Sequence, residues 1–183
     1  IGVTEPGTLG SIAVPQRDSG LPSMGGPGVS YQVYVLGEVA NPGTYRVVPS
    51  MRLDEVLGMA GGVLSRGSIR QIELRRKNGR VKKVDILSFR QNANLDANPY
   101  LLDNDVIFVP LQEKVVQIAG PVKRPGIYEL IHEKSIADVV KLAGGFSPGV
   151  GNPAPLRVIR YDHGEKQVLS LPNTPAEREK FSV

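Results

Sequence analysis

An internal repeat constrains this chain more than any other feature of its 183 residues. The stretch "VLGEVANPGTY" begins at Val35, and "IAGPVKRPGIY" begins 83 positions later at Ile118. In a gap-free alignment of residues 33–62 with 116–145, ten of the thirty positions are identical. A Pro-Gly pair and a Gly-Gly pair recur at one fixed offset, which chance does not produce. The chain therefore contains a tandem duplication, and we expect both copies to share one fold.

Each copy begins with a pattern typical of a β-hairpin. Apolar, β-branched runs at Val33–Val39 and Val115–Val122 predict a first strand. The Pro-Gly pair that follows fits the central positions of a type II turn, in which the glycine adopts a positive φ. A second strand is then expected from Tyr45 in the first copy and from Tyr128 in the second.

The spacing of apolar residues then changes to that of a helix. Apolar side chains recur at i, i+3, i+4 and i+7, which predicts a short helix with one buried stripe. The stripe consists of Leu53, Val56, Leu57 and Ala60 in the first copy and of Ile136, Val139, Val140 and Ala143 in the second. In the second copy, Ser135 and Asp138 have the spacing of a capping box. Both helices run into a Gly-Gly pair, which readily adopts the left-handed conformation that ends a helix.

A second hairpin is expected after each helix. In "IRQIELRRKNGRVKKVDIL" the turn falls at Asn78-Gly79, a strong signal for a two-residue turn. Its counterpart is "LRVIRYDHGEKQVLSL", which turns through residues 162–165. The first copy closes with an acidic turn and a strand at Val106–Val109, whereas the C-terminal "PNTPAEREKFSV" has no strand pattern. We therefore expect the second copy to lack its closing strand, and such an unpaired edge favours association or lower stability.

These patterns predict an α+β fold of two tandem β-grasp modules, each a small mixed sheet packed on one short helix. The first module is expected over residues 31–112 and the second over 113–183. Residues 1–30 contain seven Gly and four Pro, so we expect a flexible Gly/Pro-rich lead-in or linker there.

The repeated motifs resemble a known domain. The pattern V-x-V-x-G-x-V-x-x-P-G-x-Y, an apolar helix ending in A-G-G, and then L-x-x-x-D-x-I-x-V-P resembles the SLBB (soluble ligand-binding β-grasp) domain over about residues 31–171. Tandem copies resemble those of bacterial polysaccharide export outer-membrane proteins. The motif residues, which we expect to shape turns and helix ends, are Gly37, Pro42, Gly43, Tyr45, Gly61, Gly62, Gly120, Pro125, Gly126, Tyr128, Gly144 and Gly145.

The resemblance implies a non-catalytic structural and binding module of a capsule or exopolysaccharide export assembly. It also implies a location in the periplasm, on the periplasmic side of the outer membrane. The implied partners are a polysaccharide, an inner-membrane export protein and further copies of the full-length chain in a ring. A stand-alone SLBB ligand-binding protein of the periplasm is the main alternative. A competence (DNA-uptake) receptor fragment is less favoured, because we find no helix-hairpin-helix segment.

Composition speaks against enzymatic chemistry. The chain has no cysteine, which removes disulfides, thiolate nucleophiles and cysteine-ligated clusters, including those of an SLBB-containing respiratory flavoprotein. The only histidines, His132 and His163, lie in different modules without a paired spacing. Asp96, Asp103 and Asp105 lack the glycine and the final glutamate of a calcium-binding EF-hand loop. We expect no catalytic, metal or cofactor site.

The remaining candidate is a basic hairpin. Six cationic residues surround its turn: Arg75, Arg76, Lys77, Arg80, Lys82 and Lys83. They could attract an anionic partner such as an acidic polysaccharide, or they could be solvated charges that protect a sheet edge from aggregation. The net charge of +4 is small, and no nucleic acid is expected as a partner.

Overall fold

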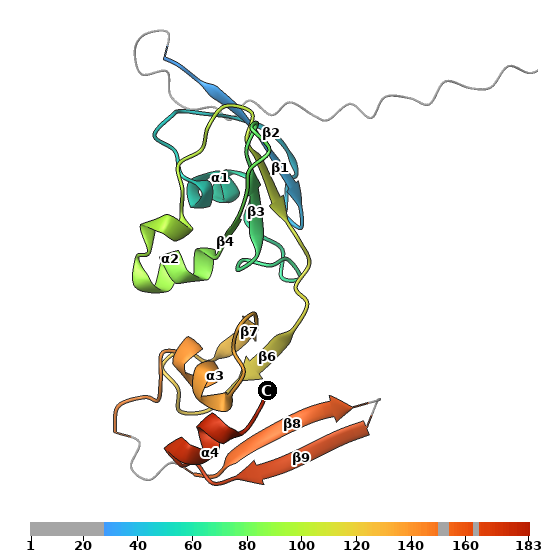
Figure 1. Cartoon of the computed structure of the whole chain (residues 1–183), viewed down its shortest axis with the longest axis vertical. Coiled ribbons are helices and arrows are strands. Elements are labelled where there is room, and N and C mark those ends of the chain that lie inside the picture. Colours follow the sequence, from blue (N-terminus) through green and yellow to red (C-terminus); the bar gives the residue numbers. More distant parts are fainter. Residues whose placement is uncertain (1–27, 150–153, 163–164) are drawn as a thin grey trace, which may run out of the picture. The chain divides into compact units, whose positions relative to one another are not determined.

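A computed structural model describes residues 28–149, 154–162 and 165–183 (Figure 1). The chain divides between Leu111 and Gln112 into two compact units, which are described separately. Most of the predicted lead-in at 1–30, and residues 163–164 of the predicted second hairpin turn, lie outside the described residues. Within those ranges, no helix has the length and apolar character needed to cross a membrane.

The first unit is built on a five-stranded mixed sheet. The strands are β1 (Tyr31–Gly37), β2 (Gly43–Val47), β3 (Ile72–Arg75), β4 (Val81–Val84) and β5 (Val106–Val109). They lie in the order β2-β1-β5-β3-β4, and β1 and β5 pair in parallel while the other neighbours are antiparallel. The closing strand β5 therefore enters between the two hairpins and joins them into one sheet.

The helix of the first unit covers the core, as predicted. Helix α1 (Leu53–Met59) and its C-terminal cap, Ala60, bury the whole predicted stripe, and Val33 and Ile107 on the strands are equally inaccessible. Burying a side chain of this size contributes roughly 1.5–3 kcal/mol. A second helix, α2 (Ile86–Asn92), and a 3-10 helix, η1 (Leu95–Ala97), connect β4 to β5.

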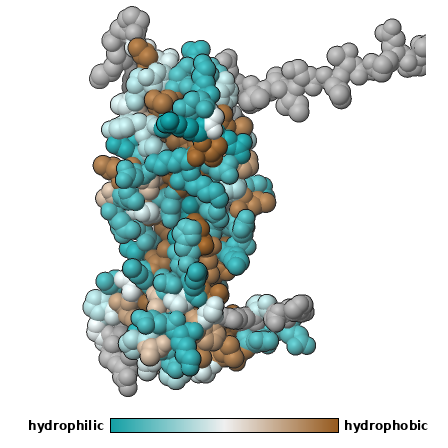
Figure 2. All heavy atoms as spheres, in the orientation of Figure 1, coloured by the Kyte–Doolittle hydropathy of each residue, from teal (hydrophilic) through white to brown (hydrophobic). Residues whose placement is uncertain are grey.

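The second unit has the same opening elements but two separate sheets. Its elements are β6 (Val115–Ile118), β7 (Gly126–Glu129), α3 (Ile136–Leu142), β8 (Leu156–Asp162), β9 (Glu165–Leu171) and α4 (Pro175–Lys180). Strands β6 and β7 form one antiparallel pair, and β8 and β9 form another. In the described part of this unit no strand joins the two pairs. Hydrophobic side chains reach its surface among hydrophilic ones (Figure 2).

The duplication is confirmed at the level of hydrogen bonds. In the first unit, the Ala40 amide donates to the carbonyl of Gly62 at 3.0 Å; in the second, the Lys123 amide donates to that of Gly145 at 2.9 Å. Further along, the amides of Leu101 and Val183 donate to the carbonyls of Met51 and Lys134. Equivalent backbone contacts thus recur near the start and near the end of both units.

The predicted type II turns are wrong. Gly43 and Gly126 begin the second strand of each hairpin, and neither has a positive φ. The left-handed glycines are instead Gly37 and Gly120, at φ 86° and 98°, which end or follow the first strand. The loop between the strands is longer than a two-residue turn because it bonds to the carbonyls at the end of the helix.

Two further local predictions need correction. The β3–β4 turn has three residues, Lys77 to Gly79, because the Arg76 amide still bonds to the Arg80 carbonyl at 2.8 Å. The segment after Val84, predicted as strand, forms α2, which Asp85 caps by accepting from the Ser88 amide at 3.1 Å.

The C-terminal segment also contains an unpredicted helix, α4. Thr174 caps it by accepting a hydrogen bond from the Glu177 amide at 3.3 Å. The sequence signal was present, because Thr-Pro-x-Glu places a cap, a first-turn proline and an acidic residue in sequence.

Candidate functional site

The first unit carries a surface hollow of 440 Å³ beside the second hairpin. Its floor and rim come from the residue before α1, from β4 and its turn, and from the segment around η1. The lining residues are Arg52, Arg76, Lys82, Leu95, Asp96, Pro99, Tyr100 and Leu102. We call this feature the Arg52 hollow.

Two cations in the hollow form no ion pair with any carboxylate in the part of the chain that the structure describes. Arg52 donates to the carbonyl of Asn98 at 2.6 Å, and its guanidinium lies 3.8 Å from the centre of the Tyr100 ring. Lys82 donates to the main-chain carbonyl of Asp96 at 2.8 Å. Because carbonyl oxygens carry no net charge, these hydrogen bonds do not neutralise either cation, and the negative charge among the lining residues is that of Asp96.

The third cation, Arg76, forms an ion pair with a buried carboxylate. It contacts the Asp105 carboxylate at 2.5 Å and the Tyr100 carbonyl at 2.9 Å. Burial raises the pKa of Asp105, although a hydrogen bond from the Leu102 amide and the charge of Arg76 act in the opposite direction. Asp105 therefore holds Arg76 and the acidic turn in place, which is a structural role.

Apolar surface lies next to these charges. Leu95, Tyr100 and Leu102 are 57%, 51% and 52% exposed, which is high for side chains of this type. Exposed apolar groups that converge on a hollow with a few fixed polar groups are typical of small-molecule sites. The arrangement suits a ligand that has one flat or apolar face and one anionic group.

The SLBB domain family matches this chain at residues 32–85 and at 115–168, which together make up more than half of its length. The chain belongs to the SLBB domain family. The two matches confirm the tandem SLBB domains expected from the repeat. The first match includes Arg52, Arg76 and Lys82, while residues 95–102 of the hollow lie beyond it.

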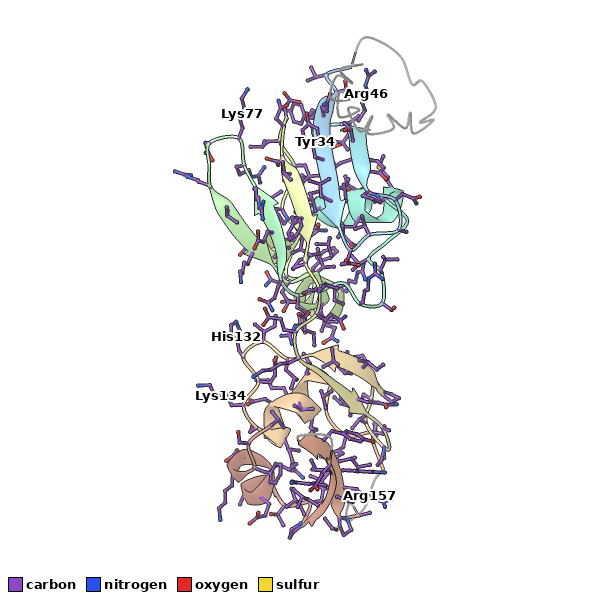
Figure 3. The ribbon with its side chains drawn as sticks, turned by 90° about the vertical axis from the view of Figure 1, so that its right-hand side faces the viewer. Tyr34, Arg46, Lys77, His132, Lys134 and Arg157 are labelled. Atoms are coloured by element: carbon purple, nitrogen blue, oxygen red, sulfur yellow. The ribbon has the colours of Figure 1, made fainter. Side chains whose placement is uncertain are left out.

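The six cations of the predicted basic hairpin do not form one patch on the first SLBB unit. Arg76 and Lys82 line the hollow. Lys77 and Arg80 are exposed at the turn, and Figure 3 shows Lys77 at the tip of the hairpin.

The remaining two cations, Arg75 and Lys83, lie on the opposite face of the same hairpin. Side chains alternate between faces along a strand, so neighbours such as Lys82 and Lys83 point to different sides. Arg75 pairs with Glu73 at 2.7 Å and lies over the Phe108 ring. Lys83 donates to Gln71 at 3.3 Å.

The motif residues shared by the SLBB units serve the backbone. Gly61 and Gly62, and their counterparts Gly144 and Gly145, have φ between 79° and 85° and end the two helices, as predicted. The Tyr45 hydroxyl donates to the Asn41 carbonyl at 2.5 Å, and the Tyr128 hydroxyl donates to that of Arg124 at 2.7 Å. Each tyrosine therefore closes the loop that precedes it.

The described ranges contain no group of three or more acidic, histidine or cysteine side chains arranged to hold a metal ion. Asp103 accepts from the Gln32 amide at 2.9 Å and Asp105 from Leu102, so these acidic residues support a turn. His132 is exposed, and His163 lies outside the described residues.

Sequence reasoning missed most of the Arg52 hollow. Leu95, Tyr100 and Leu102 belong to a segment with no periodic pattern, and Arg52 precedes them by more than forty positions. Only the sheet order, in which β5 returns beside β3, brings these residues together.

Proposed function

We propose that this chain is a non-catalytic binding and structural module of a bacterial capsule or exopolysaccharide export assembly. The observation that carries the proposal is the pair of SLBB domains in tandem, repeated to the level of individual hydrogen bonds. A duplicated scaffold of this kind places two related domains along one chain, which suits contact with an extended polymer or with neighbouring subunits.

The chemistry of the first unit supports a carbohydrate partner. Polysaccharides offer flat, partly apolar ring faces and, in many capsules, acidic groups. The Arg52 hollow supplies exposed apolar side chains beside two cations that donate to main-chain carbonyls and pair with no carboxylate of the described residues.

The proposal includes a location and partners. The protein would act on the periplasmic side of the outer membrane, in a ring of full-length subunits that contacts an inner-membrane export protein. These elements rest on the resemblance to polysaccharide export proteins, and the experiment below addresses them through the secretion phenotype.

The hollow also keeps a second candidate open, a stand-alone ligand-binding protein of the periplasm. A DNA-uptake role is less well supported, because the basic residues divide between two faces of the hairpin and several already have partners. Nucleic-acid binding relies instead on cations gathered along one surface.

An in-frame deletion of the gene in its own bacterium tests the proposal. We expect loss of surface polysaccharide while intracellular polymer persists, as measured by carbohydrate analysis of washed cells and of lysates. Return of the full-length gene should restore the surface polymer. Unchanged surface polysaccharide in the deletion strain would contradict the export function and favour the stand-alone ligand-binding protein.

A further inference from the structure

The geometry points to a carboxylate-bearing saccharide as the ligand of the Arg52 hollow. This inference rests on the proposed function and names the ligand class of one site within it. Among the described residues, the Arg52 and Lys82 side chains contact carbonyl oxygens and an aromatic ring. A carboxylate entering the hollow would accept charge-assisted hydrogen bonds from these two cations.

Contacts within the fold already place both cations at the hollow. Arg52 is held by the Asn98 carbonyl and by stacking on Tyr100, and Lys82 is held by the Asp96 carbonyl. Each of these bonds uses one N–H group, so further donors of the ammonium and guanidinium groups stay available for an acceptor. Groups that are already ordered lose less conformational entropy when they bind.

The apolar side chains at the rim of the hollow favour a ligand that has an apolar face as well as a negative charge. Leu95, Tyr100 and Leu102 are each about half exposed around the same hollow. A small inorganic anion would leave this surface in water, whereas a sugar ring carrying a carboxylate would cover it.

A matched pair of lysines on β4 makes the inference testable. Lys82 faces the hollow and Lys83 the opposite side of the sheet, and both are exposed. Replacing either lysine by glutamine removes one positive charge and keeps an N–H donor. Lys82→Gln therefore removes a charge from the hollow, whereas Lys83→Gln removes one from the opposite face of the sheet.

The experiment is an amide-NMR titration of the full chain with tetragalacturonate, with neutral maltotetraose and with a single-stranded tetranucleotide. We expect saturable shifts around Arg52, Lys82 and residues 95–102 with tetragalacturonate alone. Lys82→Gln should weaken this binding about tenfold, the typical effect of one charge-assisted hydrogen bond. Lys83→Gln should stay within about twofold, because a distant exposed charge is screened.

A second matched pair tests the apolar rim. Leu95 and Val81 are 57% and 58% exposed, but only Leu95 lines the hollow. Leu95→Ser should weaken tetragalacturonate binding about threefold through loss of apolar contact, and Val81→Ser should not. Amide spectra of the free variants establish that both are folded.

Three outcomes would overturn the inference: no localised shifts with tetragalacturonate, equal losses in the two lysine variants, or the same shifts with the tetranucleotide. They are separable from failure of the proposed function. If the protein does not bind tetragalacturonate but is required for polysaccharide secretion, the ligand assignment alone is refuted. Unchanged secretion in the deletion strain refutes the export function, whatever the titration shows.

Discussion

Gly37 and Gly120 stand at the same position of the two units, with similar positive φ angles but different surroundings. A Cβ atom on Gly37 would lie 2.1 Å from the Val109 carbonyl oxygen, because β5 runs beside β1. A Cβ atom on Gly120 would meet nothing within 4 Å, because no described strand lies along that edge of β6. Glycine is thus required at position 37 because the neighbouring strand leaves no room for a Cβ atom. At position 120 it is favoured only by the positive φ of the backbone.

The burial of equivalent side chains follows this difference. Val33 on β1 is fully buried, while Val116 at the equivalent position of β6 is partly exposed. On β8, Ile159 and Tyr161 are 48% and 72% exposed, and no third strand covers their hairpin in the described residues. The first hairpin and the helix are enough to reproduce the opening part of the repeat. An extensive core, however, depends on the strand that joins the two hairpins.

The largest expected contrast comes from alanine at the two glycines. Gly37→Ala should cost more than about 3 kcal/mol, because it adds a backbone clash to the strain of a left-handed alanine. Gly120→Ala should cost only about 1–2 kcal/mol, from the strain alone. Hydrogen exchange read by mass spectrometry reports each unit separately within the full chain. Equal losses of protection would show that β5 does not press on Gly37 as described.

A smaller contrast is expected from the matched valines. Val33→Ala should destabilise the first unit by about 2 kcal/mol, the combined cost of lost burial and a cavity. Val116→Ala should cost the second unit less than about 1 kcal/mol, because the side chain already contacts solvent. Urea-dependent hydrogen exchange measures both changes. An equal loss of stability in the Val116 and Val33 variants would contradict the comparison.

The smallest contrast is expected on acidification, and it has opposite signs in the two units. Hydrogen bonds from the Lys134 amide and from Ser135 lower the pKa of Asp138 below its ordinary 3.8. Its stabilisation of α3 is therefore complete above 3.8 and is lost as the pH falls through the lowered pKa.

Asp105 in the first unit behaves in the opposite way. Burial raises its pKa above 3.8, so acidification through the raised value relieves the cost of a buried charge. Amide exchange measured from pH 6 down to about 2.5 should show α3 losing protection while β5 does not. In Asp138→Asn this loss should disappear, and an unchanged pH dependence of α3 would contradict the capping assignment.

Sequence reasoning found the parts of the fold that depend on neighbours along the chain. The helical stripes, the Ser135 capping box and the strand at Val106–Val109 each depend on contacts within one element or on burial of one face. The Pro-Gly turn was wrong because Gly43 pairs with Val35 in the sheet ladder, and a tertiary pairing overrides local turn preference.

The candidate site was harder to predict than the fold. The basic run looked like one charged patch, but strand alternation places Lys82 and Lys83 on opposite faces. The apolar half of the hollow, including Tyr100, comes from an irregular segment whose position depends on where β5 returns. No spacing rule along the chain carries that information.

The tyrosines that close the two first loops bear on how such a domain can diversify. Tyr45 and Tyr128 bind main-chain carbonyls, so the bond makes no demand on the side chains it secures. Between identical flanking residues the loops read "EVAN" and "PVKR", so three of the four positions have diverged while the buried valine, Val39 or Val122, is kept. Mutation or grafting can therefore change the charge and the partners of such a loop while its two ends keep their positions.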